Sequence, residues 1–454
     1  MKNSIARNFN FFSLLQFAFP TMIMMVFMSL YTIVDGIFIS RLVGTDALSA
    51  TNIVYPAISL VIAIGVMLAT GGSAIIARKM GAGNFDSARE DFSFIILTGL
   101  IAGFLLMGIG NAFLEPISRV LGATDVLLDD CIGYLSVSLY LAPACILQLL
   151  FQTLFVTAGK PVFGLILTIS GGLANMVLDY LFMGPLQMGV RGAALATGIG
   201  QLIPAVVGTI YFLFVRHSLY FVKPRIRIRV LKDSCLNGSS EMVTNLSNAV
   251  VTYLFNIMML KFLGEPGVAA ITIVLYGQFL FNALYMGFSM GVAPVISFNY
   301  GSKNHPMLQK VFKICLCFIG ISSVLITVLA LISSPVIVQI FTPADSETFR
   351  IANTGFFLFS LNYLFAGINI FASSMFTAFS DGKISAVISF VRTFVLITAN
   401  ILILPYFIGV NGIWLAVPIA ECMTVFLSVY YFLKKRNDYH YFPTVRRTSD
   451  SSAN

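Results

Sequence analysis

Long apolar segments recur along the whole of this 454-residue chain, and they limit its fold more than any other feature. A helix needs about 20 residues, at about 1.5 Å each, to cross the hydrocarbon core of a bilayer. Backbone groups there must be paired within the segment, and the segments lack the alternation of barrel strands, so each is expected to be helical. Twelve segments qualify: 12–40, 47–77, 92–114, 130–157, 162–183, 189–215, 240–262, 268–298, 311–334, 350–378, 384–407 and 411–433.

The composition excludes a soluble protein. The chain is 58% hydrophobic and 10% charged, with a mean hydropathy of +0.92, whereas a soluble domain carries about 25% charged residues. The sequence therefore predicts an all-α integral membrane protein, with membrane lipid as its main surroundings.

The basic residues predict the orientation. With both termini on one side, 21 of the 27 Lys and Arg residues fall on that side and five on the other, with Arg392 inside a span. The positive-inside rule then places both termini in the cytoplasm. The net charge of +8 is spread in this way, so the basic cluster 223–232 is interpreted as an anchor on anionic lipid, and no nucleic-acid partner is expected.

The first half of the sequence is similar to the second half when the chain is shifted by a constant number of residues, which aligns Met22 with Met242. The strongest match pairs 189–196 with 409–416, and the other landmarks in register are Gly44 and Gly264, Ala50 and Ala270, Gly71 and Gly291, Gly81 and Gly301, Asn84 and Asn304, and Asp125 and Asp345. Apolar segments resemble one another by chance, but a single offset that also holds in the loops favours a duplication.

The duplication predicts two lobes of six helices each. An even number of helices gives both lobes the same orientation, which is a parallel repeat about an axis along the membrane normal. The expected units are a first lobe, 1–218, a cytoplasmic linker, 219–239, a second lobe, 240–433, and a cytoplasmic tail, 434–454. Two lobes that rock about a shared cleft are typical of a transporter.

Two aspartates inside apolar segments are the main candidates for chemistry. Asp35 and Asp179 lie at similar predicted depth, in the half of the first lobe away from the termini. Asn175 precedes Asp179 by one helical turn, Thr197 reaches a comparable depth, and Tyr31 precedes Asp35 by one turn. An acid inside a membrane is costly to bury and indicates function, so these oxygens could hold Na⁺ or a proton. The alternative is that each aspartate only hydrogen-bonds the backbone or a neighbouring helix.

The internal repeat argues against a purely structural role for the two aspartates. The positions that match Asp35 and Asp179 are Phe255 and Ala399, so the six-helix fold itself does not require the acids. No histidine lies at membrane depth, and no nucleophile or resident metal site is visible, so neither an enzyme nor a cofactor is expected.

Other embedded polar residues have two interpretations. Glu421 could contact a substrate or join two helices, whereas Arg392 and Glu241 are expected to snorkel toward the cytoplasmic side. Pro20 removes one helical hydrogen bond, so it could be a hinge or a static bend. The candidate substrate cavity comprises Tyr31, Gln148, Gln152, Asn256, Gln278, Asn282 and Glu421.

Several short motifs, in order and spacing, resemble the multidrug and toxic compound extrusion (MATE) family, in particular its bacterial MepA-like branch. They are Pro20 with Val34-Asp35-Gly36, the loop 81–84, residues 158–161, Asn175 with Asp179, residues 189–197, and Tyr300-Gly301. The resemblance covers essentially the whole chain.

The resemblance implies export of cationic or amphiphilic drugs, driven by Na⁺ or H⁺, from a bacterial inner membrane. It implies an ion or proton site at Asp35, Asn175, Asp179 and Thr197, and a bend of the first helix at Pro20. A monomer is expected to suffice. The alternative function is a flippase for a lipid-linked or amphiphilic metabolite, although the spans offer only Arg392 for a pyrophosphate-linked substrate.

Overall fold

The computed structural model describes residues 4–442, and every regular element within that range is helical. Lys2, Arg446, Arg447 and the end of the predicted tail, 443–454, lie outside the described residues. The first lobe contains α1 (Phe11–Phe38) with η2 (Ile39–Val43), α2 (Thr45–Gly81), α3 (Phe85–Ala112), α4 (Leu114–Val120), α5 (Leu128–Tyr140), α6 (Ala142–Thr157), α7 (Pro161–Met183) and α8 (Gly189–Phe214), preceded by η1 (Ser4–Ala6).

The second lobe is built from the helices that follow α8, from residue 228 onward. They are α9 (Ile228–Gly301), α10 (His305–Phe341), α11 (Glu347–Phe359), η3 (Ser360–Asn362), α12 (Tyr363–Ala378), α13 (Gly382–Phe390), η4 (Val391–Leu396), α14 (Ile397–Ile408) and α15 (Val410–Tyr439).

These helices make up the twelve predicted spans. Ten continuous helical stretches in the described chain are long and apolar enough to cross a membrane, and α5 with α6 forms an eleventh that is bent by 53°. The 74-residue helix α9 contributes two spans, because its backbone leaves the helical region at Gly264 (φ 66°, ψ −157°). The prediction of an all-α membrane protein with twelve spans is therefore confirmed.

The internal repeat is visible in the backbone. Gly44 and Gly264 both have positive φ, 131° and 66°, at the turn after the first span of each lobe. Gly189 and Gly409 also have nearly equal positive φ, 60° and 62°, at the starts of α8 and α15. Each pair is separated by the offset of the repeat, and a positive φ favours glycine, so the matching glycines mark equivalent turns.

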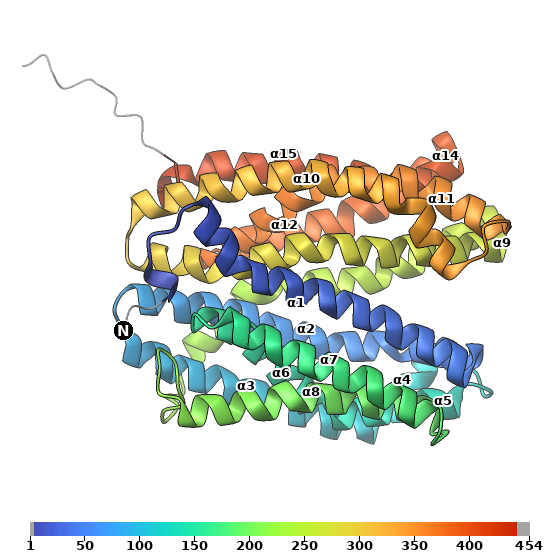
Figure 1. Cartoon of the computed structure of the whole chain (residues 1–454), viewed down its shortest axis with the longest axis horizontal. Coiled ribbons are helices and arrows are strands. Elements are labelled where there is room, and N and C mark those ends of the chain that lie inside the picture. The colour runs from blue at the N-terminus through green and yellow to red at the C-terminus, as the bar shows by residue number, and fades with distance from the viewer. Residues whose placement is uncertain (1–3, 443–454) are drawn as a thin grey trace, which may run out of the picture.

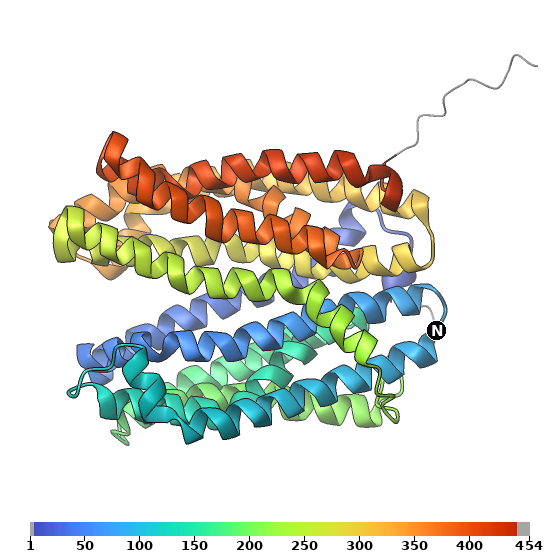
Figure 2. The ribbon, with the colours of Figure 1, turned by 180° about the vertical axis from the view of Figure 1, so that it is seen from behind.

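The two lobes lie side by side with their helices roughly parallel (Figure 1). Both ends of the described chain are at one end of the bundle, which we call the terminal end, and α4 and α11 are at the other, the far end (Figure 1). Helix α1 begins beside the second lobe and ends in the first, whereas α9 begins beside the first lobe and continues into the second (Figure 2).

Aromatic packing holds the interior of the first lobe together. The ring of Phe212 in α8 lies 4.8 Å from that of Phe92 in α3 and 4.7 Å from that of Phe155 in α6. The outer faces of the helices are also apolar, for example at the exposed residues Phe104 and Leu325. Apolar groups on both faces suit a bundle that is surrounded by lipid.

Candidate functional site

Two carboxyl groups meet between α1 and α7. Asp179 is completely buried and Asp35 is half-buried, and the two side chains lie close enough to interact. Oδ1 of Asp35 and both carboxyl oxygens of Asp179 have no partner in hydrogen-bonding geometry among the described residues. The structure therefore brings the two acids together, and no ion pair among the described residues involves either of them.

Amide and hydroxyl groups surround this acidic pair. Asn175, one turn before Asp179, donates a hydrogen bond from Nδ2 to Oγ1 of Thr197 in α8, at 3.3 Å. The carbonyl oxygen of the Asn175 side chain is buried and has no hydrogen-bond partner among the described residues. The four residues that we predicted as an ion or proton site thus form one cluster across three helices.

A glycine allows α1 to approach α7 at this cluster. A Cβ at Gly172 would lie 2.5 Å from the ring of Phe27 and 3.0 Å from that of Tyr31. Any larger residue at position 172 would push α1 away, so this close approach holds Asp35 against the helix that carries Asp179.

Three tyrosines complete the surroundings, and only Tyr31 among them was predicted from the sequence. Tyr31 and, from the second lobe, Tyr276 of α9 are near enough to Asp35 to influence it electrostatically, and Tyr134 of α5 is near enough to influence both acids. A phenol inside a membrane span seeks a polar partner, which was the available signal for Tyr134. These phenols can donate hydrogen bonds to a charged carboxylate or to a bound ligand.

The remaining cavity candidates are dispersed over both lobes. Gln148 and Gln152 are buried in α6, and Gln152 donates from Nε2 to Sδ of Met28, at 2.8 Å. Asn256 and Asn282 of α9 each have a buried amide oxygen with no partner among the described residues, and Gln278 is half-buried nearby in sequence. Within residues 4–442, no hydrogen bond joins these three α9 residues to the acidic pair.

The second lobe contains a buried ion pair instead. Arg392 in η4 donates from Nε to both oxygens of Glu421 in α15, at 2.8 and 3.0 Å, and the two residues are 9% and 1% exposed. Asn369 in α12 also donates to Glu421 Oε2, at 2.7 Å, and accepts a bond from Ser428.

This network corrects the expectation that Arg392 snorkels. The guanidinium reaches a buried carboxylate on a neighbouring helix, which compensates its charge better than a stretched side chain would. Glu421 joins three segments of the lobe through these bonds. Glu241 of α9 interacts electrostatically with Arg392.

The MatE family model matches residues 20–181 and again 242–402, so the same model fits each lobe once. The chain belongs to the MatE family. MatE proteins are transporters rather than enzymes, and the double match agrees with the internal repeat.

Curated relatives of this MatE chain extend over nearly its whole length. The multidrug export protein MepA of Staphylococcus haemolyticus is 25% identical over 440 residues, which cover 94% of each chain. MepA of Staphylococcus saprophyticus is 24% identical over 434 residues, again with 94% of each chain covered.

Solved structures share the fold of this MatE chain. A MATE protein in complex with MaL6 superimposes with a TM-score of 0.88, at 22% identity over 97% of this chain and 98% of that one. A multidrug resistance MATE family transporter in an outward-facing conformation also gives 0.88, at 21% identity over 94% and 96%. The resemblance noted in the sequence is therefore confirmed.

Proposed function

We propose that this protein exports organic cations and amphiphilic drugs in exchange for Na⁺ or H⁺, by alternating access of its two lobes. The Asp35–Asp179 cluster is the ion or proton site in this proposal. MatE membership and the MepA relatives support multidrug export, and the geometry of the first lobe supports the coupling.

The observation that carries the proposal is the contrast between buried acids. Glu421 is paired with Arg392, and Asp91 of α3 with Lys79 and Arg227, whereas no basic side chain contacts Asp35 or Asp179 among the described residues. Two uncompensated carboxyl groups side by side favour the uptake of a positive charge. A proton shared between them or a Na⁺ held by their oxygens would supply it.

Coupling follows if the ion binds one conformation of the lobes more tightly than the other. Uptake of a cation at the pair changes the charge between α1 and α7, and thus the packing of α1. Pro20 of α1 leaves one helical carbonyl without its usual donor, so α1 can bend there at reduced cost. Bending of α1 would link the occupied pair to release of the drug.

The test is dye efflux from cells that express the wild type, Asp35→Asn or Asp179→Asn, with expression and folding verified. Na⁺ and pH gradients are imposed separately on ethidium-loaded cells. We expect the wild type to export the dye under one gradient and each variant to lose at least about tenfold in rate. Asp345→Asn, on an exposed residue at the far end, is the matched control and retains the wild-type rate.

The outcomes separate the competing proposals. Equal efflux by the two variants and the wild type would show that the acids are structural, and the coupling site would be wrong. If the wild type moves no dye under either gradient, drug export fails, and transfer of a fluorescent lipid between leaflets tests the flippase alternative.

A further inference from the structure

Backbones of the two lobes touch directly at the terminal end. A Cβ on Gly81, at the end of α2, would lie 1.9 Å from the carbonyl oxygen of Phe298 in α9. A Cβ on Gly301, at the end of α9, would lie 2.0 Å from the carbonyl oxygen of Arg78. Both distances are shorter than any contact a Cβ can make, so neither position has room for a side chain.

These two contacts are equivalent under the internal repeat. Phe298 and Gly301 are the repeat partners of Arg78 and Gly81, since both pairs have the offset of the internal repeat. The ends of α2 and α9 therefore cross at the axis that relates the lobes, and each glycine lies against the repeat partner of the residue three positions before it.

A second layer of the same kind lies further along the helices. A Cβ on Gly71 would be 1.9 Å from the carbonyl oxygen of Ser234, and one on Gly238 would be 1.9 Å from that of Met67. These contacts join α2 to the first turns of α9.

The repeat counterpart of this layer joins α1 to the second span of α9. A Cβ on Gly287 would lie 2.5 Å from Cα of Met22, and one on Gly291 would lie 2.9 Å from Cα of Ala18. Gly287 and Gly291 are the repeat partners of Met67 and Gly71. The layer is therefore built twice, once on each side of the axis.

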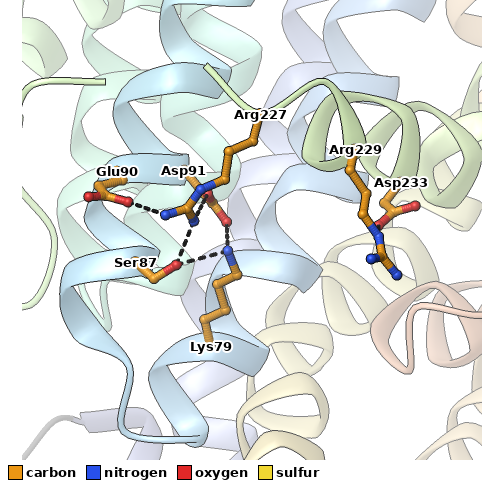
Figure 3. A network of polar contacts seen from close by, with 7 residues as sticks. All are labelled: Lys79, Ser87, Glu90, Asp91, Arg227, Arg229 and Asp233. Carbon is orange, nitrogen blue, oxygen red and sulfur yellow. Dashed lines mark hydrogen bonds and ion pairs between the residues drawn. The ribbon is translucent and has the colours of Figure 1, made fainter. Parts of the chain in front are cut away.

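An ionic cluster fixes the start of α9 to the first lobe beside these layers. Arg227, the residue before α9, pairs with Glu90 and Asp91 of α3, and Lys79 of α2 pairs with Asp91 (Figure 3). Ser87 accepts hydrogen bonds from both basic side chains, and Asp91 is completely buried. The first turns of α9 are thus held to the first lobe, although the rest of α9 belongs to the second.

We propose that these glycine contacts and the Arg227 cluster are the seal that closes the terminal end of the transporter. The inference rests on alternating access, in which the lobes part at each end in turn. Glycine matters because direct backbone contact leaves no passage for water or substrate. An added methyl would clash only while the seal is closed, so it would shift the equilibrium toward the state that is open at this end.

Hydrogen–deuterium exchange of the full chain in lipid nanodiscs tests the seal without added ion or drug. For Gly81→Ala and Gly301→Ala we expect about tenfold faster exchange in 67–84, 228–242 and 287–304, because exchange follows local opening. Segments 171–179 and 196–202, at the contact of α7 with α8, should exchange as in the wild type. The matched controls are Gly108→Ala and Gly320→Ala, where an added Cβ meets nothing within 4 Å.

A second variant covers the case in which a glycine variant fails to fold. Arg227→Gln adds no bulk and loosens the same end, and we expect it to accelerate exchange in 67–84 and 228–242. Unchanged exchange there in Arg227→Gln, or in folded glycine variants, would overturn the proposal. Since exchange is measured without transport, this result stands apart from whether the protein exports ethidium.

Discussion

Among the described residues, each buried acidic or basic side chain lies either in an ion pair or beside another acid, and the two arrangements have different consequences. Arg392 and Glu421 form the paired case, with Asn369 and Ser428 completing the network. Asp35 and Asp179 form the other case, because they lie side by side without a basic partner among the described residues. Pairing favours a stable structure, whereas two uncompensated acids favour the binding of a cation.

The Arg392–Glu421 pair gives a prediction on stability. Arg392→Met leaves Glu421 buried without its counter-charge, which should destabilise the fold by about 3–5 kcal/mol. The double variant Arg392→Met/Glu421→Leu removes both charges and should recover most of that loss, since Asn369 still donates to the main-chain oxygen of residue 421.

Denaturant unfolding in detergent micelles measures both variants of this pair. Arg229→Met is the control, because Arg229 is exposed and its contact with Asp233, at 3.9 Å, should contribute no measurable stability. A double variant as unstable as the single one would show that the loss arises from the arginine's packing and not from the uncompensated carboxylate.

At the level of helices, the contact between α1 and α7 decides how close the two acids are. Gly172→Val would insert a branched side chain where Phe27 and Tyr31 already lie within 3.0 Å of an added Cβ. Helix α1 should shift outward and separate Asp35 from Asp179. We expect the Na⁺ or proton concentration for half-maximal dye efflux to rise about tenfold, with the protein still folded.

The control for Gly172→Val is Gly108→Val, which adds the same side chain at an open helical position. Efflux titrated against the driving cation distinguishes the two variants. An unchanged half-maximal concentration with a lower maximal rate would contradict the prediction, because it would mean that α1 motion was slowed while ion affinity was intact.

The pattern of the helices themselves was predictable, and their pairing was less so. The sequence alone indicated that Asp35 and Asp179 lie at matched depth in the first lobe, because an acid in an apolar segment is visible without knowledge of the contacts. Helix α9 begins at Ile228, whereas the sequence predicted a membrane span only from position 240. The reason is that segment 228–239 is too polar to resemble a membrane span. That segment packs on α2 of the other lobe, and this contact supports its helix. The pairing of Arg392 with Glu421 likewise depends on how η4 meets α15, which no spacing along the chain reveals.

For the molecule as a whole, three features bear on how the protein is oriented in the membrane. They are the internal repeat, the shared position of the chain ends and the distribution of charge. The structure places the ends of the described chain together, as an even number of spans in each lobe requires. The sequence assigns 21 basic residues to that side and five to the other, and this asymmetry favours the cytoplasm for the terminal end. The seal at the terminal end would then close the cytoplasmic side.

This orientation gives the last prediction. Green fluorescent protein fused after Asn454, or before Met1, should fluoresce, because that reporter matures in the cytoplasm but not after export in unfolded form. Alkaline phosphatase inserted at the far end, in the exposed turn at residues 344–345, should be active, because it requires the oxidising exterior. Removing charges at the terminal end, by Lys223→Gln, Arg225→Gln and Lys232→Gln together, should lower the fluorescent fraction, since these residues retain the loop inside. A dark terminal fusion with an inactive far-end phosphatase would reverse the assignment, and the seal would then face outward.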